Sequence, residues 1–251
     1  SADVEIISVM LSLLSEAGIE GVHLDLGNVG VFRALADSAG LSDEQQSELF
    51  DLLKLKCQTD TLAWVERELS DSRLTEAFSL VASMQGSASA LTDKFARLAE
   101  LVPVAAQQLS DMTQAIEALM QRFPQVSITC DLTELRGYDY HTGLVFAAYV
   151  PGYGDAVAQG GRYDETGADF GRARPATGFS ADLKVLAALG QRQFEAKETV
   201  AAPASDDPSL WQAITDLRTK GYRVVTEANG DVAGASQRLQ QNDGQWILVS
   251  A

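Results

Sequence analysis

Apolar residues near the start of the chain recur every three or four positions, the spacing that places side chains on one face of a helix. Over residues 3–17 these positions are Val4, Ile7, Leu11, Leu14 and Ala17. After Gly18 the period changes to two, because apolar and polar residues alternate along residues 22–27. Such alternation predicts a half-buried strand, so the chain opens with a predicted helix and a predicted strand.

Helical periodicity dominates the middle of the chain. Ser42 is followed three residues later by Gln45, which is the signature of an N-terminal capping box, so a helix is expected to begin there. The longest apolar stripe runs through Leu91, Phe95, Leu98, Val102, Ala105, Leu109, Met112, Ile116 and Leu119. Pro103 lies inside this stripe and is expected to kink the helix or to divide it. We expect a helical insertion over about residues 41–120 of a domain that covers residues 1–192.

Alternation with a period of two returns at residues 126–132, and residues 143–150 are rich in β-forming residues. We therefore expect two strands that flank the segment between them. Residues 177–189 return to a helical pattern. Residues 193–208 carry prolines and acidic residues without any period, as is typical of a linker.

The C-terminal residues 209–251 are predicted to form a small α/β segment that docks on the main body or on a partner. The apolar spacing predicts helices at 211–217 and 232–239, and strands at 223–227 and 246–250.

Composition excludes several classes of protein. The chain has 251 residues, 46% of them hydrophobic, and a formal net charge of −16. Nucleic-acid binding draws most of its affinity from Lys and Arg, and no basic stripe is present, so we expect no nucleic-acid partner. No apolar run approaches the roughly 20 residues of a membrane span, and the N-terminus lacks the order of a secretory signal. We expect a cytoplasmic protein with no membrane partner.

The residues that usually carry catalysis are scarce. Cys57 and Cys130 have no CxxC partner and are interpreted as two buried small hydrophobes rather than as a disulfide or a metal site. His23 and His141 are the only histidines, which limits acid–base chemistry. Asp25 lies on the same strand face as His23 and is either its partner or a solvated neighbour. We expect no metal, no cofactor and no catalytic residue.

Two segments carry the chemistry of recognition. The first is Leu-Arg-Gly-Tyr-Asp-Tyr-His-Thr-Gly at residues 135–143, and the second is Gly-Gly-Arg-Tyr-Asp at residues 160–164. Arg136 offers a fork of donors suited to a carboxylate, and the aromatic residues after it add polar tips. If the first segment were a strand, Arg136, Tyr138 and Tyr140 would share one face. Gly160 and Gly161 permit close backbone approach and positive φ, and Arg162 could pair with Asp164 in a turn.

A third segment, residues 175–186, follows in the same order as in a known family. Together with residues 24–32, the three segments resemble the histidyl-tRNA synthetase superfamily over residues 20–190. The resemblance implies an α+β fold of the class II aminoacyl-tRNA synthetase type, with an antiparallel sheet, flanking helices and a helical insertion. It also implies that histidine is the ligand, bound by Arg136, Tyr138, Tyr140, His141, Gly160, Gly161, Arg162 and Tyr163.

Departures from the synthetase pattern narrow the resemblance. In the third motif Val185 replaces the arginine that holds ATP, and Lys184 leaves a helix about 100° away from that position. His141 stands where the synthetases have tyrosine. The first and second class II motifs are absent from the sequence, so the resemblance implies a partial domain that corresponds to the C-terminal two-thirds of a family member.

The nearest resemblance is to the noncatalytic paralogue of the synthetases, the regulatory subunit of ATP phosphoribosyltransferase. It implies a non-enzymatic, self-associating protein that assembles with a short-form catalytic subunit, is required for the first step of histidine biosynthesis and takes part in feedback control by histidine. Two alternatives stay open, namely a fragment of a histidyl-tRNA synthetase and a free-standing histidine sensor.

Overall fold

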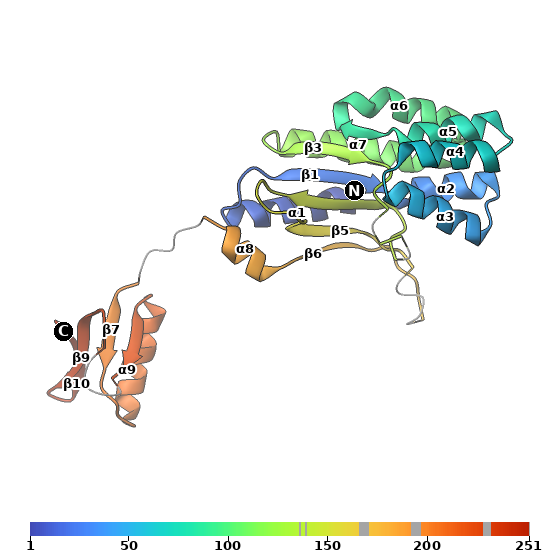
Figure 1. Cartoon of the computed structure of the whole chain (residues 1–251). Helices are drawn as coiled ribbons and strands as arrows, with labels where there is room; N and C mark the ends of the chain where they lie inside the picture. Colours follow the sequence, from blue (N-terminus) through green and yellow to red (C-terminus); the bar gives the residue numbers. More distant parts are fainter. Residues whose placement is uncertain (136, 139, 166–170, 192–196, 228–231, 251) are drawn as a thin grey trace. The chain divides into compact units, whose positions relative to one another are not determined.

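The computed structural model describes residues 1–135, 137–138, 140–165, 171–191, 197–227 and 232–250. The chain forms two compact units, Ser1–Arg192 and Gln193–Ala251 (Figure 1). Each unit has its own hydrophobic core. Within the described ranges, no helix is both long and apolar enough to cross a bilayer.

The first unit is built on a six-stranded sheet with the order β2-β3-β1-β4-β5-β6. The strands are β1 His23–Asn28, β2 Gln85–Ser87, β3 Ser127–Asp131, β4 Leu144–Tyr149, β5 Ala158–Arg162 and β6 Thr177–Ala181. Neighbouring strands run antiparallel, as expected, except that β1 and β3 are parallel. A parallel pair needs a long crossover connection, and the helices between β1 and β3 supply it.

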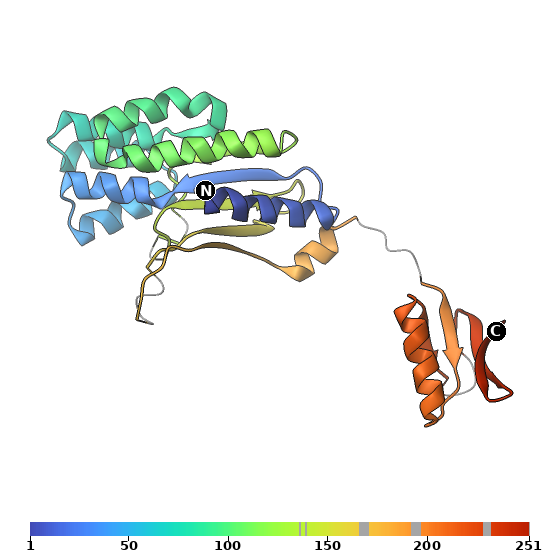
Figure 2. The same ribbon diagram turned by 180° about the vertical axis from the view of Figure 1, so that it is seen from behind.

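Two helices lie side by side along the sheet, namely α1 Ala2–Glu16 and α7 Ala106–Arg122 (Figure 2). The helix predicted at 3–17 is confirmed, and its predicted apolar residues are buried except Ala17, which caps the helix and is partly buried. Burial of this stripe fixes α1 against β5 and β6, which places Asp3 of its first turn beside the sheet.

A run of helices begins directly after β1 and contains the predicted helical insertion at about residues 41–120. Its helices are α2 Val29–Ala39, α3 Asp43–Lys54, α4 Gln58–Glu68, α5 Ser72–Ala82, α6 Ala88–Leu101 and then α7. The capping box at Ser42 and Gln45 is confirmed, with both reciprocal hydrogen bonds present. Pro103 divides the long apolar stripe, since a 3-10 turn, Pro103–Ala105, separates α6 from α7. Proline removes a backbone donor, which ends α6 at Leu101.

The helix predicted at 177–189 is wrong in its first half. Residues Thr177–Ala181 form β6, and only Leu183–Leu189 form a helix, α8. Asp182 caps this helix by accepting a hydrogen bond from the Lys184 backbone N–H at 2.8 Å. Pairing with β5 decides the outcome, because a cross-strand partner is invisible to local periodicity.

The second unit contains β7 Thr199–Ala202, α9 Pro208–Thr219, β8 Arg223–Thr226, β9 Ala235–Asn242 and β10 Gln245–Ser250, with sheet order β10-β9-β7-β8. The helix at 211–217 and the strands at 223–227 and 246–250 are confirmed, within one to three residues at their ends. Two expectations are wrong. Strand β7 lies inside the segment interpreted as a linker, and a strand, β9, replaces the helix predicted at 232–239.

A two-residue turn explains the second error. Asn242 pairs with Gln245 across Asp243 and Gly244, whose φ angles are 48° and 77°. Positive φ at both central residues is the geometry of a type I′ turn, and Asp-Gly is a preferred sequence for it. This turn makes β9 and β10 a hairpin, so the Asp-Gly pair was the signal that the apolar spacing concealed.

Candidate functional site

A tight turn between β3 and β4 presents the first recognition segment. Gly137 adopts φ +67°, and its carbonyl accepts hydrogen bonds from the backbone N–H groups of Tyr140 at 2.9 Å and His141 at 2.7 Å. A side chain at Gly137 would also meet the His141 ring, with Cε1 at 2.8 Å from an added Cβ. Glycine is therefore required both by the backbone and by the ring. Arg136 and Asp139 lie outside the described residues.

This turn forms one wall of a cavity of about 420 Å³. The described residues that line it are Asp25, Glu134, Gly137, Tyr140, His141, Val145, Phe146, Ala147, Gln159, Gly160, Tyr163, Gly178, Phe179 and Ser180. Four of the residues predicted for histidine binding are among them, namely Tyr140, His141, Gly160 and Tyr163. The cavity thus joins the two recognition segments, which are about twenty residues apart in sequence.

Aromatic rings give the cavity a shaped wall. Tyr140 stacks on Tyr163 with ring centroids 5.0 Å apart, and it meets His141 edge to face at 5.2 Å. Offset stacking and edge-to-face contact are the favoured arrangements of aromatic rings. The stack therefore holds Tyr140 and Tyr163, which come from the two recognition segments, against each other in the cavity wall.

Three glycines allow this close packing. A Cβ at Gly161 would lie 2.7 Å from Cδ2 of His141, and one at Gly178 would lie 2.8 Å from the Tyr163 hydroxyl. A Cβ at Gly160 would lie 2.7 Å from Cα of Phe179 on β6. Close approach at Gly160 and Gly161 is confirmed, but both residues belong to β5 rather than to a loop, and neither has positive φ.

Tyr138 and Arg162 lie away from the cavity. The described residues 137, 138 and 140 form a turn rather than a strand, so Tyr138 and Tyr140 do not share a face. Tyr138 packs between Phe32 at 5.4 Å and Phe50 at 5.2 Å, and its hydroxyl donates to Gln46 at 3.2 Å. It therefore anchors the helical insertion to the turn.

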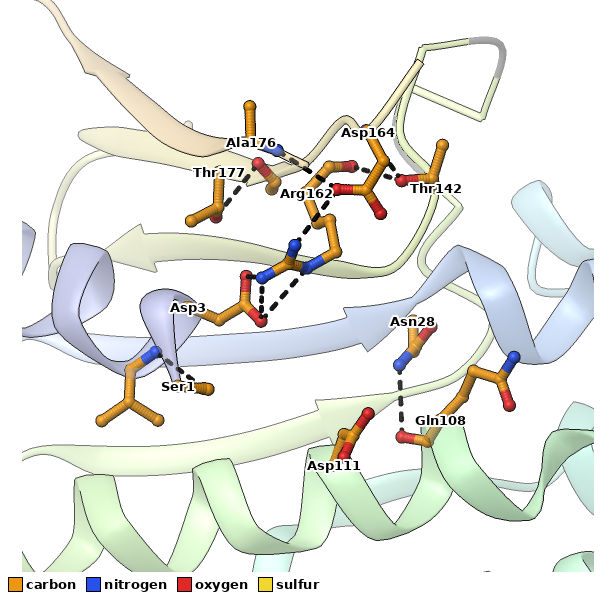
Figure 3. Close-up of polar contacts among 12 residues, drawn as sticks. Ser1, Asp3, Asn28, Gln108, Asp111, Thr142, Arg162, Asp164, Ala176 and Thr177 are labelled. Atoms are coloured by element: carbon orange, nitrogen blue, oxygen red, sulfur yellow. Dashed lines mark hydrogen bonds and ion pairs between the residues drawn. The ribbon is translucent and has the colours of Figure 1, made fainter. Parts of the chain in front are cut away.

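Arg162 projects toward α1, as Figure 3 shows. Its guanidinium donates to both carboxylate oxygens of Asp3, at 2.9 and 2.8 Å, and to Asp164 at 3.1 Å. The predicted pair with Asp164 is present, and Asp164 also accepts from the Ala176 N–H (Figure 3). Burial opposes the charge of Arg162, but Asp3 and Asp164 outweigh it and raise the pKa of the guanidinium. Neighbouring residues of a strand face opposite sides of the sheet. The Arg162 side chain therefore lies on the side of β5 opposite to the one on which the His141 ring covers Gly161.

Asp25 on β1 is a cavity residue that the sequence reading did not assign. The Thr129 hydroxyl donates to Oδ1 of Asp25 at 2.8 Å, and Nε2 of His23 lies 2.8 Å from the same hydroxyl. Since the hydroxyl has a single proton and gives it to Asp25, Nε2 of His23 is the donor in the second contact. Thr129 therefore bridges His23 and Asp25. The signal for this contact is the register of β1 against β3, which sequence does not reveal.

Burial raises the pKa of Asp25. The Thr129 hydrogen bond opposes this effect, while the negative charges of Asp131 and Glu134 add to it. By contrast, the carboxylate of Asp131 is well compensated, since it pairs with Lys56 at 2.7 Å and accepts two hydrogen bonds from Thr133. Asp131 therefore has a cation and two hydrogen bonds to stabilise its charge, whereas among the described residues Asp25 has one hydrogen bond.

A second cavity of about 350 Å³ adjoins the first. Its described lining residues are His23, Asp25, Lys56, Gln85, Gly86, Thr129, Glu134 and Tyr149. Asp25 and Glu134 line both cavities and therefore form their common wall. Across the described ranges, no group of three or more His, Cys, Asp or Glu residues could hold a metal ion.

The two cysteines differ from the expectation that both are buried. Cys130 on β3 is fully buried, but Cys57 is only partly so, and its thiol donates to Asp60 at 2.9 Å. Cys57 is the residue before α4, and its thiol faces the side chain of Asp60 in the first turn of that helix, so Cys57 is only partly buried. Both thiols are free.

Comparison with known protein families and sequences gives matches to both units of the chain. The family model described as histidyl-tRNA synthetase matches residues 1–186, and the model of the ATP phosphoribosyltransferase subunit HisZ C-terminal domain matches residues 197–249. The ATP phosphoribosyltransferase regulatory subunit of Pseudomonas fluorescens strain Pf0-1 is 43% identical over 253 residues, which cover 98% of this chain and 64% of that protein. The chain spans 64% of the length of the first curated relatives it matches.

Solved structures show the same fold. An ATP phosphoribosyltransferase regulatory subunit/histidyl-tRNA synthetase from Bacillus halodurans C aligns with a TM-score of 0.70 and 24% identity, covering 92% of this chain and 60% of that one. A chain of the ATP phosphoribosyl transferase (HisG:HisZ) complex from Thermotoga maritima aligns with a TM-score of 0.54 and 20% identity, covering 71% of this chain and 59% of that one. With a family match over residues 1–186, the chain belongs to the histidyl-tRNA synthetase family.

Proposed function

We propose that the whole protein is the noncatalytic regulatory subunit of an ATP phosphoribosyltransferase and that it works in the cytoplasm. The observation that carries this proposal is the 43% identity, over 98% of the chain, to a regulatory subunit of that enzyme. The similarity extends into the second unit, whose residues 197–249 match a domain of the same subunit. That extension favours a regulatory subunit over a histidyl-tRNA synthetase.

The third motif supports a role without adenylation. Val185 occupies the position of the ATP-holding arginine, and its side chain packs against the core of the first unit. Lys184, one position earlier, is exposed on α8. A planar guanidinium that binds phosphates bidentately has no replacement in a valine, so we expect no histidyl adenylate to form.

The proposed partner is a short-form catalytic subunit. The Thermotoga maritima structure contains a chain of this fold within an ATP phosphoribosyl transferase complex. By analogy, the whole protein self-associates, assembles with the catalytic subunit and enables the first step of histidine biosynthesis. Feedback then requires that histidine bind the inactive arrangement of the complex more tightly than the active one, because a ligand shifts an equilibrium only by its differential affinity.

The cavity at the recognition segments is the proposed histidine site. A volume of about 420 Å³ lies within the range of small-molecule sites, and aromatic walls with a few polar groups are typical of them. Tyr140, His141, Gly160 and Tyr163 line it, with Gly161 directly beneath the His141 ring. Arg136 stays a proposed partner of the ligand carboxylate. Tyr138 and Arg162 hold the surrounding structure, so their proposed contribution is to shape the site.

Two assays on the whole protein test this function. Size-exclusion chromatography with a purified short-form catalytic subunit should yield a complex that contains both chains. Histidine-dependent exchange between ATP and pyrophosphate should be absent, with an active histidyl-tRNA synthetase as the positive control. Exchange activity would identify a synthetase, whereas histidine binding without a complex would favour a free-standing sensor.

A further inference from the structure

Among the described residues that line the main cavity, the acidic side chains have no basic counterpart. Its described lining residues include two carboxylates, Asp25 and Glu134, and no lysine or arginine. The stacked rings of Tyr140 and Tyr163 add negative π faces to the same wall. A negative cavity with aromatic walls favours a ligand that carries a cationic nitrogen.

Asp25 is fixed in this cavity by a chain of two hydrogen bonds. Thr129 donates to Oδ1 of Asp25, and His23 donates to Thr129. Over the part of the chain that the structure describes, Oδ2 of Asp25 accepts no hydrogen bond. One oxygen thus orients the carboxylate, and the other is left for a partner that the described residues do not supply.

The position of Asp25 is unfavourable for the free protein. A half-buried carboxylate with one hydrogen bond stands near two further acids, and Lys56, whose positive charge acts on it, is already paired with Asp131. Buried polar groups normally find partners within the protein. A residue whose charge is poorly compensated inside a cavity is typical of a binding site, where the ligand completes the interaction.

We propose that Asp25 is a ligand-binding residue that accepts a hydrogen bond from a cationic nitrogen of the ligand, with Thr129 and His23 as positioning residues. This inference rests on the proposed function, in which the cavity holds histidine. The shared chemistry is a charged N–H donor, which histidine offers both in its α-ammonium group and in a protonated imidazole. Asp25 therefore binds the cationic part of the amino acid, whereas Arg136 is proposed to bind its carboxylate.

Isothermal titration calorimetry on the whole protein tests the assignment with three ligands. Histidine has every group, histamine lacks the carboxylate, and imidazolepropionate lacks the ammonium group. The variant Asp25→Asn keeps the size of the side chain and an acceptor for Thr129 but removes the charge. It should weaken histidine and histamine binding by about tenfold to a hundredfold, as expected for the loss of a charge-assisted hydrogen bond. Unchanged affinity for imidazolepropionate would assign the contact to the ammonium group, and loss for all three would assign it to the imidazole.

Two further variants separate binding from folding. Asp51→Asn removes the same charge from the exposed surface of α3 and should leave all three affinities unchanged. Thr129→Val removes the orienting hydroxyl and should weaken the same ligands as Asp25→Asn, by a smaller factor. The set of ligands that Thr129→Val weakens should match the set that Asp25→Asn weakens, and urea unfolding of both variants separates this effect from a loss of fold.

Histidine affinity in Asp25→Asn equal to that of the unaltered protein would overturn the inference, as would absence of histidine binding by the unaltered protein. Either result is separate from the regulatory proposal, because complex formation with the catalytic subunit is measured without histidine.

Discussion

The environment of a single side chain decides its chemistry, and the two thiols of this chain illustrate the point. Burial raises the pKa of Cys130 to about 12, and the charges of Asp25 and Asp131 add to the effect. A thiol with such a pKa stays protonated near neutral pH and is a poor nucleophile. Cys57 is partly exposed.

One fast-reacting thiol is therefore expected in the folded protein. Ellman's reagent should modify Cys57 within the first phase, and Cys130 only as the fold opens. The variant Cys57→Ser should abolish the fast phase, while unfolding in urea should expose both thiols of the unaltered chain. Two thiols that react equally fast without urea would contradict the buried position of Cys130.

Asp25 gives a pH dependence of stability with a definite sign. Its pKa is raised above 3.8 in the folded state, so the folded chain binds more protons than the unfolded chain between the two pKa values. The contribution of Asp25 to stability therefore falls as pH rises through that window and stays low above it.

Asp25→Asn removes this loss. Its free energy of unfolding, measured in urea between about pH 4 and pH 8, should gain on that of the unaltered protein as pH rises and then run parallel to it. The neutral amide is also cheaper to bury. A variant that is less stable at the upper end of this range would indicate that Asp25 serves the fold rather than a ligand.

The order of the motifs in the sequence predicted some of the residues that line the cavity. Tyr140, His141, Gly160 and Tyr163 were found because their motifs are short and ordered. Tyr138 was misplaced, since alternation holds for strands and the segment turns at Gly137. The place of Asp25 in the cavity was not predicted, because its hydrogen bond from Thr129 depends on strand pairing across about a hundred residues.

Among the elements, the end of α3 shows how a side chain can outweigh backbone preference. Lys56 follows the helix with φ +53°, a conformation that favours glycine. Its ammonium pairs with the buried carboxylate of Asp131 on β3, so the pair ties the helical insertion to the sheet. Burial lowers the pKa of Lys56, but Asp131 and the neighbouring acids more than offset this and raise it.

Replacing Lys56 should therefore cost stability in a graded way. Lys56→Ala leaves Asp131 buried without its cation and keeps the backbone strain, and we expect a loss of about 1–2 kcal/mol in the free energy of unfolding. Lys56→Gly loses the same pair but relieves the strain, which recovers about 0.5–1 kcal/mol. Urea unfolding measures both, with the exposed Lys54→Ala as a control. Equal losses for the two variants would show that the strain at Lys56 has no energetic weight.

Elements with a local signal were predictable. The helix at 3–17, the capping box at Ser42 and the break at Pro103 all follow from residues within a few positions of one another. Strand β6 and strand β9 were mistaken for helix because their pairing with β5 and β10 is what holds them extended. Non-local pairing overrides local spacing wherever the apolar residues are few.

For the whole molecule, fold class followed from ordered motifs rather than from periodicity. The α+β class with a mainly antiparallel sheet, a helical insertion and a small C-terminal α/β unit is observed. The parallel pairing of β1 with β3 could not be predicted from the sequence, since the connection between the two strands spans the whole helical insertion. A net charge of −16 also fits the proposed function, in which the partners are a protein and an amino acid rather than tRNA.

The most direct test of the regulatory proposal is the phosphoribosyltransferase rate of a purified short-form catalytic subunit, with and without the whole protein, across a titration with histidine. We predict that the protein stimulates the rate and that histidine reverses the stimulation. The binding linkage requires this reversal if histidine favours the inactive arrangement. A folded, histidine-binding protein that leaves the rate unchanged at every histidine concentration would contradict the proposal.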